Sequence, residues 1–160
     1  MRFILRTSVV LSLGILALGL CAGRAAAQAR DPVPALTKLL RDENVDVRRA
    51  AAKALTRMPR TQGAIPALIE ALKDADPFVR DNAVDAICSM APGEVVPGLI
   101  RALKDANPNS RRRAAEALMR LGRYVDDAIP DLIVLLKDEN ADVRRAATEA
   151  LRRILVGSWD

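Results

Sequence analysis

The chain has 160 residues, of which 51% are hydrophobic, 28% charged and 2% aromatic, and it contains no histidine. The lack of histidine excludes histidine-dependent catalytic triads and most zinc and iron sites, and the scarcity of aromatic side chains disfavours platforms that stack nucleic-acid bases. The formal net charge of +5 is weak support for binding to nucleic acid.

The first 29 residues have the layout of a secretory signal peptide. Arg2 and Arg6 precede an uncharged apolar stretch, residues 7–23, and small residues follow at positions 25–29. We therefore predict that residues 1–29 are a signal peptide, and that the rest of the chain is exported to the periplasm or secreted.

Cleavage is expected after Ala27 or Ala29. An uncleaved segment that anchors the protein in the membrane remains an alternative, although 17 apolar residues are short for a span of about 20. Lipid attachment at Cys21 is a further alternative, but bacterial lipoprotein signals normally carry a small residue where this chain has Leu20. Removal of the segment leaves 22 basic and 20 acidic residues, a net charge of +2.

Residues 30–160 repeat one pattern four times. The copies start at prolines about 32 residues apart and agree in more than seven columns. A fixed period of this size is typical of a solenoid, in which each unit contacts only its neighbours. The prolines are Pro34, Pro66, Pro97 and Pro130, and the predicted repeats span about residues 31–62, 63–93, 94–126 and 127–160.

Each repeat is expected to fold as a helical hairpin. Leucines two and six residues after the proline lie at helical spacing, so the first helix should begin at the proline and run for about nine or ten residues. The second helix should extend for about 12 to 14 residues from a capping residue ten positions after the proline. These predicted caps are Asn44, Asp76, Asn107 and Asn140.

Alanines at every third or fourth position of the second helix allow neighbouring helices to approach closely. One hairpin with so little apolar bulk cannot bury a core alone, whereas stacked hairpins can. No stretch shows the alternation of a strand, so we predict an all-α fold: an α-solenoid of four stacked helical hairpins, preceded by the signal peptide. The residues expected to end the units are Pro59, Gly63, Pro92, Gly93 and Gly122.

The run PALIEALKDADPFVR, residues 66–80, resembles a HEAT repeat, and more narrowly the short HEAT-like repeats of phycobilin lyases. The resemblance extends over residues 31 to about 156. It implies a binding function, because such repeats serve as scaffolds, lyase subunits and enzyme regulators. It also implies that the second helices line the concave face.

On that face, the polar positions of the second helices hold nine basic and four acidic residues. Such a surface favours an acidic protein partner. The alternative is a soluble helix face whose charges pair along one helix, as Arg112 with Glu116 and Arg145 with Glu149. The predicted partner-binding residues are Arg49, Lys53, Asp81, Asp85, Arg112, Arg113, Arg145 and Arg152.

An aspartate and an arginine recur in every repeat, eight and fourteen residues after the proline. We interpret them as a structural ladder, in which each arginine binds carboxylate and carbonyl oxygens across the turn or in the next repeat. An anion-binding row of arginines is the alternative. The ladder consists of Asp42, Asp74, Asp105 and Asp138 with Arg48, Arg80, Arg111 and Arg144.

No catalytic, cofactor or metal site is predicted. Asp126, Asp127 and Asp131 contain the ligand type that calcium prefers, but a solvated loop and a helix first turn explain them as well. After cleavage Cys88 has no cysteine with which to form an internal disulfide. We expect an inert thiol, with a disulfide-linked dimer as the lesser alternative.

These features favour an exported, non-catalytic scaffold for protein–protein interaction. The alternatives are an accessory subunit of a lyase or other enzyme and, less favoured, a nucleic-acid binder. The end repeats offer surfaces for self-association, unless the tail with Val156 and Trp159 folds back over the last repeat. No membrane span is expected once the signal is removed.

Overall fold

The computed structural model describes residues 31–58 and 61–156. Every regular element in this part of the chain is a helix, which confirms the predicted all-α class. No helix there combines the length and the hydrophobicity that a membrane crossing requires. The predicted signal segment with Cys21, the predicted breaker Pro59 and Trp159 of the tail lie outside the described residues.

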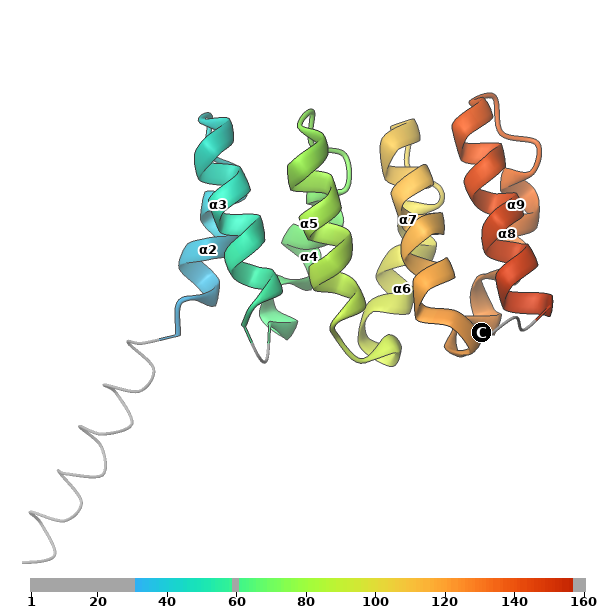
Figure 1. Cartoon of the computed structure of the whole chain (residues 1–160), viewed down its shortest axis with the longest axis horizontal. Coiled ribbons are helices and arrows are strands. Elements are labelled where there is room, and N and C mark those ends of the chain that lie inside the picture. Colours follow the sequence, from blue (N-terminus) through green and yellow to red (C-terminus); the bar gives the residue numbers. More distant parts are fainter. Residues whose placement is uncertain (1–30, 59–60, 157–160) are drawn as a thin grey trace, which may run out of the picture. The chain divides into compact units, whose positions relative to one another are not determined.

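Within the described residues, four helical hairpins follow one another (Figure 1). Their first helices are α2 (Val33–Leu39), α4 (Ile65–Ala71), α6 (Pro92–Ala102) and α8 (Ile129–Leu135). Their second helices are α3 (Val45–Thr56), α5 (Pro77–Cys88), α7 (Pro108–Leu121) and α9 (Ala141–Val156). Short 3₁₀ helices join the first hairpin to the second, η1 (Gln62–Ala64), and the third to the fourth, η2 (Gly122–Tyr124) and η3 (Asp126–Ala128).

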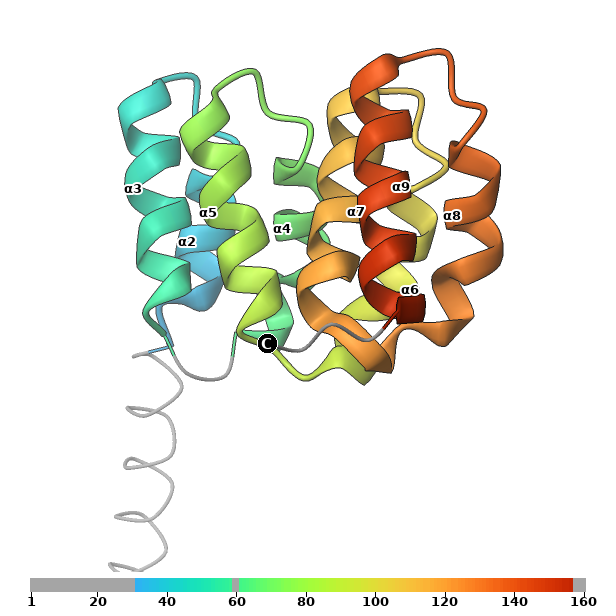
Figure 2. The same cartoon turned by 45° about the vertical axis from the view of Figure 1, so that its right-hand side comes forward.

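The hairpins stack in two layers. In one layer, α3 packs against α5, α5 against α7 and α7 against α9. Each first helix packs against the second helix of its own hairpin, so the first helices form the other layer (Figures 1 and 2). This arrangement is the predicted α-solenoid.

Three of the first helices are shorter than predicted. The helices α2, α4 and α8 have seven residues each and begin one residue before the repeat proline. After them the chain tightens into turns with i→i+3 hydrogen bonds, as where the amide of Asp74 donates to the carbonyl of Ala71 at 3.1 Å. The predicted helical length therefore includes these turns.

The first helix of the third hairpin, α6, differs from the first helices of the other hairpins. It begins at Pro92, so the repeat proline, Pro97, lies inside the helix. The prediction that Pro92 and Gly93 end a unit is wrong, because proline also fits a first helical turn, where its missing N–H would have no partner. The predicted boundary between residues 93 and 94 therefore falls within α6.

The second helices begin at the predicted caps. The side chains of Asn44, Asn107 and Asn140 accept hydrogen bonds from the amides two residues further on, at 2.8 to 2.9 Å. Asp76 accepts from the amide of Val79 at 3.1 Å. At the other end of α7, Gly122 adopts a φ of 71°, which side chains disfavour, and stops the helix as predicted.

A thin core of leucine, valine, isoleucine and alanine runs through the stack. The leucine six residues after each repeat proline shows how the hairpins cover one another. Its exposed fraction is 4% at Leu40, 0% at Leu72 and 1% at Leu103, but 40% at Leu136. The following repeat therefore buries this leucine, and Leu136 has no such repeat among the described residues.

Candidate interaction surface

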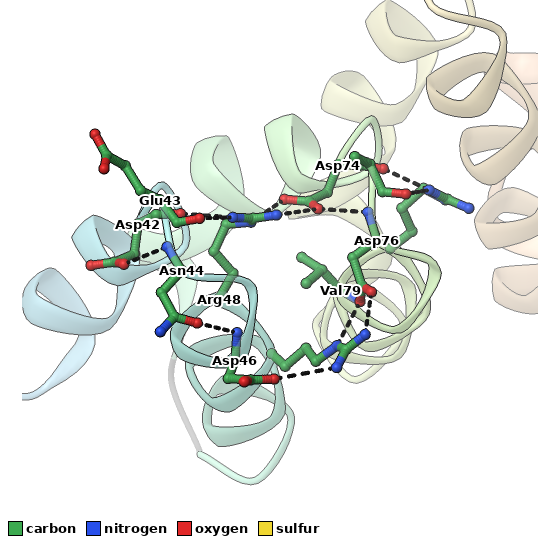
Figure 3. A network of polar contacts seen from close by, with 11 residues as sticks. Asp42, Glu43, Asn44, Asp46, Arg48, Asp74, Asp76 and Val79 are labelled. Carbon is green, nitrogen blue, oxygen red and sulfur yellow. Dashed lines mark hydrogen bonds and ion pairs between the residues drawn. The ribbon is translucent and has the colours of Figure 1, made fainter.

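The ladder arginine of the first repeat ties two loops together. Nε and Nη2 of Arg48 donate to the carboxylate of Asp74 in the next repeat, at 2.8 and 3.2 Å (Figure 3). Its Nη1 donates to the carbonyl oxygens of Asp42 at 2.8 Å and Glu43 at 3.1 Å. The Asp74 carboxylate also accepts from the amide of Asp76 at 2.8 Å, which fixes its own turn.

The same contact joins the third and fourth repeats. Nε and Nη2 of Arg111 donate to the carboxylate of Asp138 at 2.7 and 2.9 Å, and its Nη1 donates to the carbonyls of Asp105 and Ala106. Both side chains are buried. The hydrogen bond from Arg111 lowers the pKa of Asp138, and it raises the pKa of Arg111 in turn. The pair therefore stays ionised.

The middle junction lacks this contact. Nη1 of Arg80 binds the carbonyls of Asp74 and Ala75, at 2.6 and 2.9 Å, but the guanidinium does not bind Asp105. The buried Nε of Arg80 has no hydrogen-bond partner within the described residues. Asp105 lies instead 3.9 Å from Nζ of Lys73. The ladder thus binds carboxylates at two of its three internal junctions.

Most of the predicted partner-binding residues are paired within the protein. Arginines from both neighbouring repeats bind the carboxylate that caps α5 and the two carboxylates within it, so these acids lie at the junctions between repeats. These pairs are Arg49 with Asp76 at 2.6 and 3.0 Å, Arg113 with Asp81 at 2.5 Å, and Arg120 with Asp85 at 2.6 Å. Figure 3 shows the first of them.

Other charges of the face pair along a single helix. Arg112 lies 3.7 Å from Glu116, as the alternative interpretation predicted. Arg145 binds Asp142 at 2.7 Å and not Glu149, whose carboxylate binds Arg152 at 2.6 Å. The remaining predicted contact, Lys53, is exposed and has no ion pair within residues 31–58 and 61–156.

An open groove of about 710 Å³ lies between α7 and α9. Met119 and Ala146 supply its apolar surface, and both pack partly against the core. Arginine and carboxylate side chains from both helices surround these two residues. The charged residues of the groove are Arg112, Glu116, Asp142, Arg145 and Glu149.

Three cations of the second-helix face form no ion pair within the described residues, although the charge of Arg153 helps to lower the pKa of Glu149. These cations are Lys53 and Arg57 in the first repeat and Arg153 in the last. The carboxylates of this face, by contrast, are each bound to an arginine. The described part of the face therefore has a surplus of positive charge.

The other candidate sites have structural explanations. The described residues contain no group of three or more acidic or cysteine side chains placed to hold a metal ion. Asp131, from the acidic cluster considered above, binds Lys104 at 3.0 Å. Burial raises the pKa of the Cys88 thiol, which favours the unreactive protonated form.

Arg49 holds the pKa of Asp76 well below its ordinary value of 3.8, at about 2. The hydrogen bond from Arg49 is the main cause, and the backbone amide of Val79 adds to it. Because the pKa is lower in the folded state than in the unfolded chain, the ionised carboxylate stabilises the fold above pH about 4. This stabilisation is lost as the pH falls from about 4 to about 2.

We expect the substitution Arg49→Gln to return the pKa of Asp76 towards 3.8 and to reduce the loss of stability in this pH window. A carboxyl ¹³C NMR titration measures the pKa. Arg145→Gln is the matched control, because Arg145 pairs only with Asp142 on its own helix. A pKa of Asp76 that stays near 2 in the Arg49→Gln protein would contradict the assignment.

A family model of HEAT repeats matches residues 9–88 and 65–152. The chain belongs to the HEAT repeat family. The first match begins inside the segment predicted to be a signal peptide, and the second ends at residue 152 within α9, so the two matches reach all four hairpins. The resemblance stated from residues 66–80 is thereby confirmed. No curated protein sequence matches the chain significantly.

Solved structures share the HEAT-type fold. One, of the complex of CpcE and CpcF of phycocyanin lyase from Nostoc sp. PCC7120, has 22% identity and a TM-score of 0.58 over 78% of this chain and 79% of that one. Another, from work on microtubule plus-end tracking by XMAP215, CLIP-170 and EB1, has 20% identity and a TM-score of 0.63 over 80% and 68%.

An engineered protein has 22% identity to the HEAT repeats of this chain and a TM-score of 0.50, over 78% of this chain and 62% of its own. The chain thus spans less than two thirds of the length of that engineered protein. At these identities the likenesses show a common fold.

Proposed function

We propose that this HEAT repeat protein is an exported, non-catalytic scaffold that binds an acidic segment of another protein on the face of its second helices. The groove between α7 and α9 carries the proposal. It combines an apolar surface, Met119 and Ala146, with the guanidinium groups of Arg112 and Arg145, which a partner's carboxylates would share with Glu116 and Asp142. An extended or helical segment with apolar anchors and carboxylates fits such a groove.

The charge of the face supports an acidic partner. Its carboxylates are already bound to arginines, whereas Lys53, Arg57 and Arg153 have no ion pair among the described residues. A partner therefore meets a surplus of positive charge, which speeds encounter and favours acidic sequences over basic ones. The stacked core beneath keeps these groups at fixed positions. Binding therefore costs little conformational entropy of the protein.

A photo-crosslinking amino acid in place of Met119 tests the groove in cells that produce the protein. We expect a covalent adduct with one partner, and the double substitution Arg112→Glu with Arg145→Glu should reduce its yield about tenfold or more, because carboxylates of the partner would be repelled. Thermal melting checks that the double variant remains folded.

Arg101 of α6 provides the matched control, because it is exposed and lies in the other helix layer. A crosslinker there should give no adduct, and Arg101→Glu should leave the adduct at Met119 unchanged. The proposal fails if the double charge reversal preserves the Met119 adduct, or if both positions yield the same adducts.

Export rests on the residues of the N-terminal segment: Arg2 and Arg6, the apolar stretch 7–23 and the small residues that follow. Mass spectrometry of the protein purified for crosslinking reads its N-terminus. We expect it to begin at Gln28 or Arg30 and to come from the exported fraction. A protein that begins at residue 1 or 2 and stays in the cytoplasm would contradict export.

A further inference from the structure

The ladder has two incomplete ends with opposite charge. At the N-terminal end, the Asp42 carboxylate accepts the amide of Asn44 at 2.9 Å, but no guanidinium or ammonium group of the described residues binds it. Its counterparts Asp74 and Asp138 each receive an arginine fork from the preceding repeat. In Figure 3 the carboxylate of Asp42 lies on the side of its loop away from the second repeat.

At the C-terminal end, an arginine lacks its carboxylate. Nη1 of Arg144 donates to the carbonyls of Asp138 and Glu139, at 2.7 and 3.0 Å, as in the other repeats. Within the described residues, no carboxylate lies within ion-pair distance of its guanidinium. The guanidinium edge that binds a carboxylate in Arg48 and Arg111 is therefore unused in Arg144.

The apolar side chains beside these groups are uncovered as well. Leu136 is exposed although its three equivalents are buried. Ile133 is 52% exposed. Its equivalent Ile69 faces the next repeat, because a Cβ atom built on Gly98 would lie 3.3 Å from Ile69. The C-terminal end face thus presents the surface that the inner repeats use for stacking.

The N-terminal end face presents the opposite half of the same contact. Leu36 and Val47 are partly exposed. Their equivalents in the second repeat, Leu68 and Val79, are fully buried, and that repeat follows another one, with α5 packed against α3. The two end faces of one chain therefore have the apolar residues and the charged groups of an internal junction, one half each.

We propose that the chain associates with a second copy of itself head to tail, with the fourth repeat of one copy stacked on the first repeat of the next. In this contact Arg144 of one copy binds Asp42 of the other, as Arg111 binds Asp138 within the chain. Leu136 then packs against Leu36 and Val47, and Ile133 lies opposite Ala35, the equivalent of Gly98.

This contact uses the ends of the stack and leaves the groove between α7 and α9 open, so it goes beyond the proposed function and does not depend on it. Because the two surfaces differ, the contact is heterologous. Each added copy exposes a fresh face, and the product is a row of copies, or a ring if the rotation closes.

Sedimentation velocity of the purified protein over a range of concentrations tests the proposal. We expect the mass of the wild-type protein to increase with concentration. Asp42→Arg alone and Arg144→Asp alone should each shift this increase to concentrations about tenfold higher or more, because each places like charges opposite one another.

An equimolar mixture of the two variants should recover the association, because every contact between unlike copies again joins opposite charges. Recovery also shows that both variants are folded, since a misfolded chain would not regain binding. Arg101→Asp, on an exposed residue of α6 in an inner repeat, is the control and should associate like the wild type.

Three results would overturn the proposal. The first is a wild-type protein that stays monomeric up to about 1 mM. The second is association that persists unchanged in both single variants, which would place the contact on another surface. The third is a mixture that associates no better than its components, although circular dichroism shows both to be helical.

Discussion

Replacing Leu72 by alanine is expected to lower the free energy of unfolding by about 3 kcal/mol. The Leu72 side chain is fully buried and belongs to the continuous core. The substitution removes apolar surface from that core and leaves a cavity, and a core built largely of alanine and leucine has few long side chains with which to fill it. Urea denaturation followed by circular dichroism measures the loss.

The control for Leu72→Ala is Leu39→Ala in α2. Leu39 is an exposed leucine at the end of a first helix. Its truncation should cost less than about 1 kcal/mol, in the range of ordinary surface substitutions. A loss below about 1 kcal/mol for Leu72→Ala as well would contradict the packing described here.

Arg111→Ala is expected to destabilise the protein by about 3 kcal/mol. The substitution leaves the buried Asp138 carboxylate without its counterion, and it removes a donor from the carbonyls of Asp105 and Ala106. Truncation of one partner of a buried ion pair costs more than the pair contributes, because the other charge remains desolvated. Urea denaturation again measures the change.

Arg80→Ala is the matched control for Arg111→Ala. Arg80 occupies the same column and binds two carbonyls in the same way, but no ladder carboxylate depends on it. We expect its truncation to cost clearly less than that of Arg111. Equal losses would show that the carbonyl contacts alone stabilise the repeats, and that the carboxylate of the next repeat adds nothing.

Features of local origin could be predicted from the sequence. The caps Asn44, Asn107 and Asn140 were identifiable because a cap depends on hydrogen bonds to amides within the next few residues. The start of α6 could not be identified in this way, because proline and glycine occur both where helices begin and where they end. Burial of Val95 and Val96 against the core extends this helix, and burial depends on tertiary contacts.

The positions that recur in every repeat identified the ladder residues, but not which of the arginines bind the aspartate of the next repeat. Arg48, Arg80 and Arg111 occupy one column, yet Arg80 does not bind the carboxylate of the next repeat. Whether the fork reaches that carboxylate depends on the distance between neighbouring loops. The pattern contains the residue types and their order, but no information on that distance.

The charges of the second helices were found from the sequence, but their partners were not. The four acids of this face, counted as surface charges, are bound to arginines. Arg120 of the third repeat, which lies 35 residues from Asp85 in the sequence, binds it across the junction with the second repeat. Opposite charges at neighbouring polar positions of successive repeats are the sequence signal for such a pair. The groove with Met119 had no signal, because it forms between two helices.

The central claim is that each repeat is buried by the repeat that follows it. Alanine substitution of the four equivalent leucines, Leu40, Leu72, Leu103 and Leu136, tests this claim most directly when unfolding is measured at a concentration where the protein is monomeric. We predict losses of about 2 to 4 kcal/mol at the first three positions and less than about 1 kcal/mol at Leu136. Equal losses at all four positions would contradict the claim, because each hairpin would then bury its own leucine.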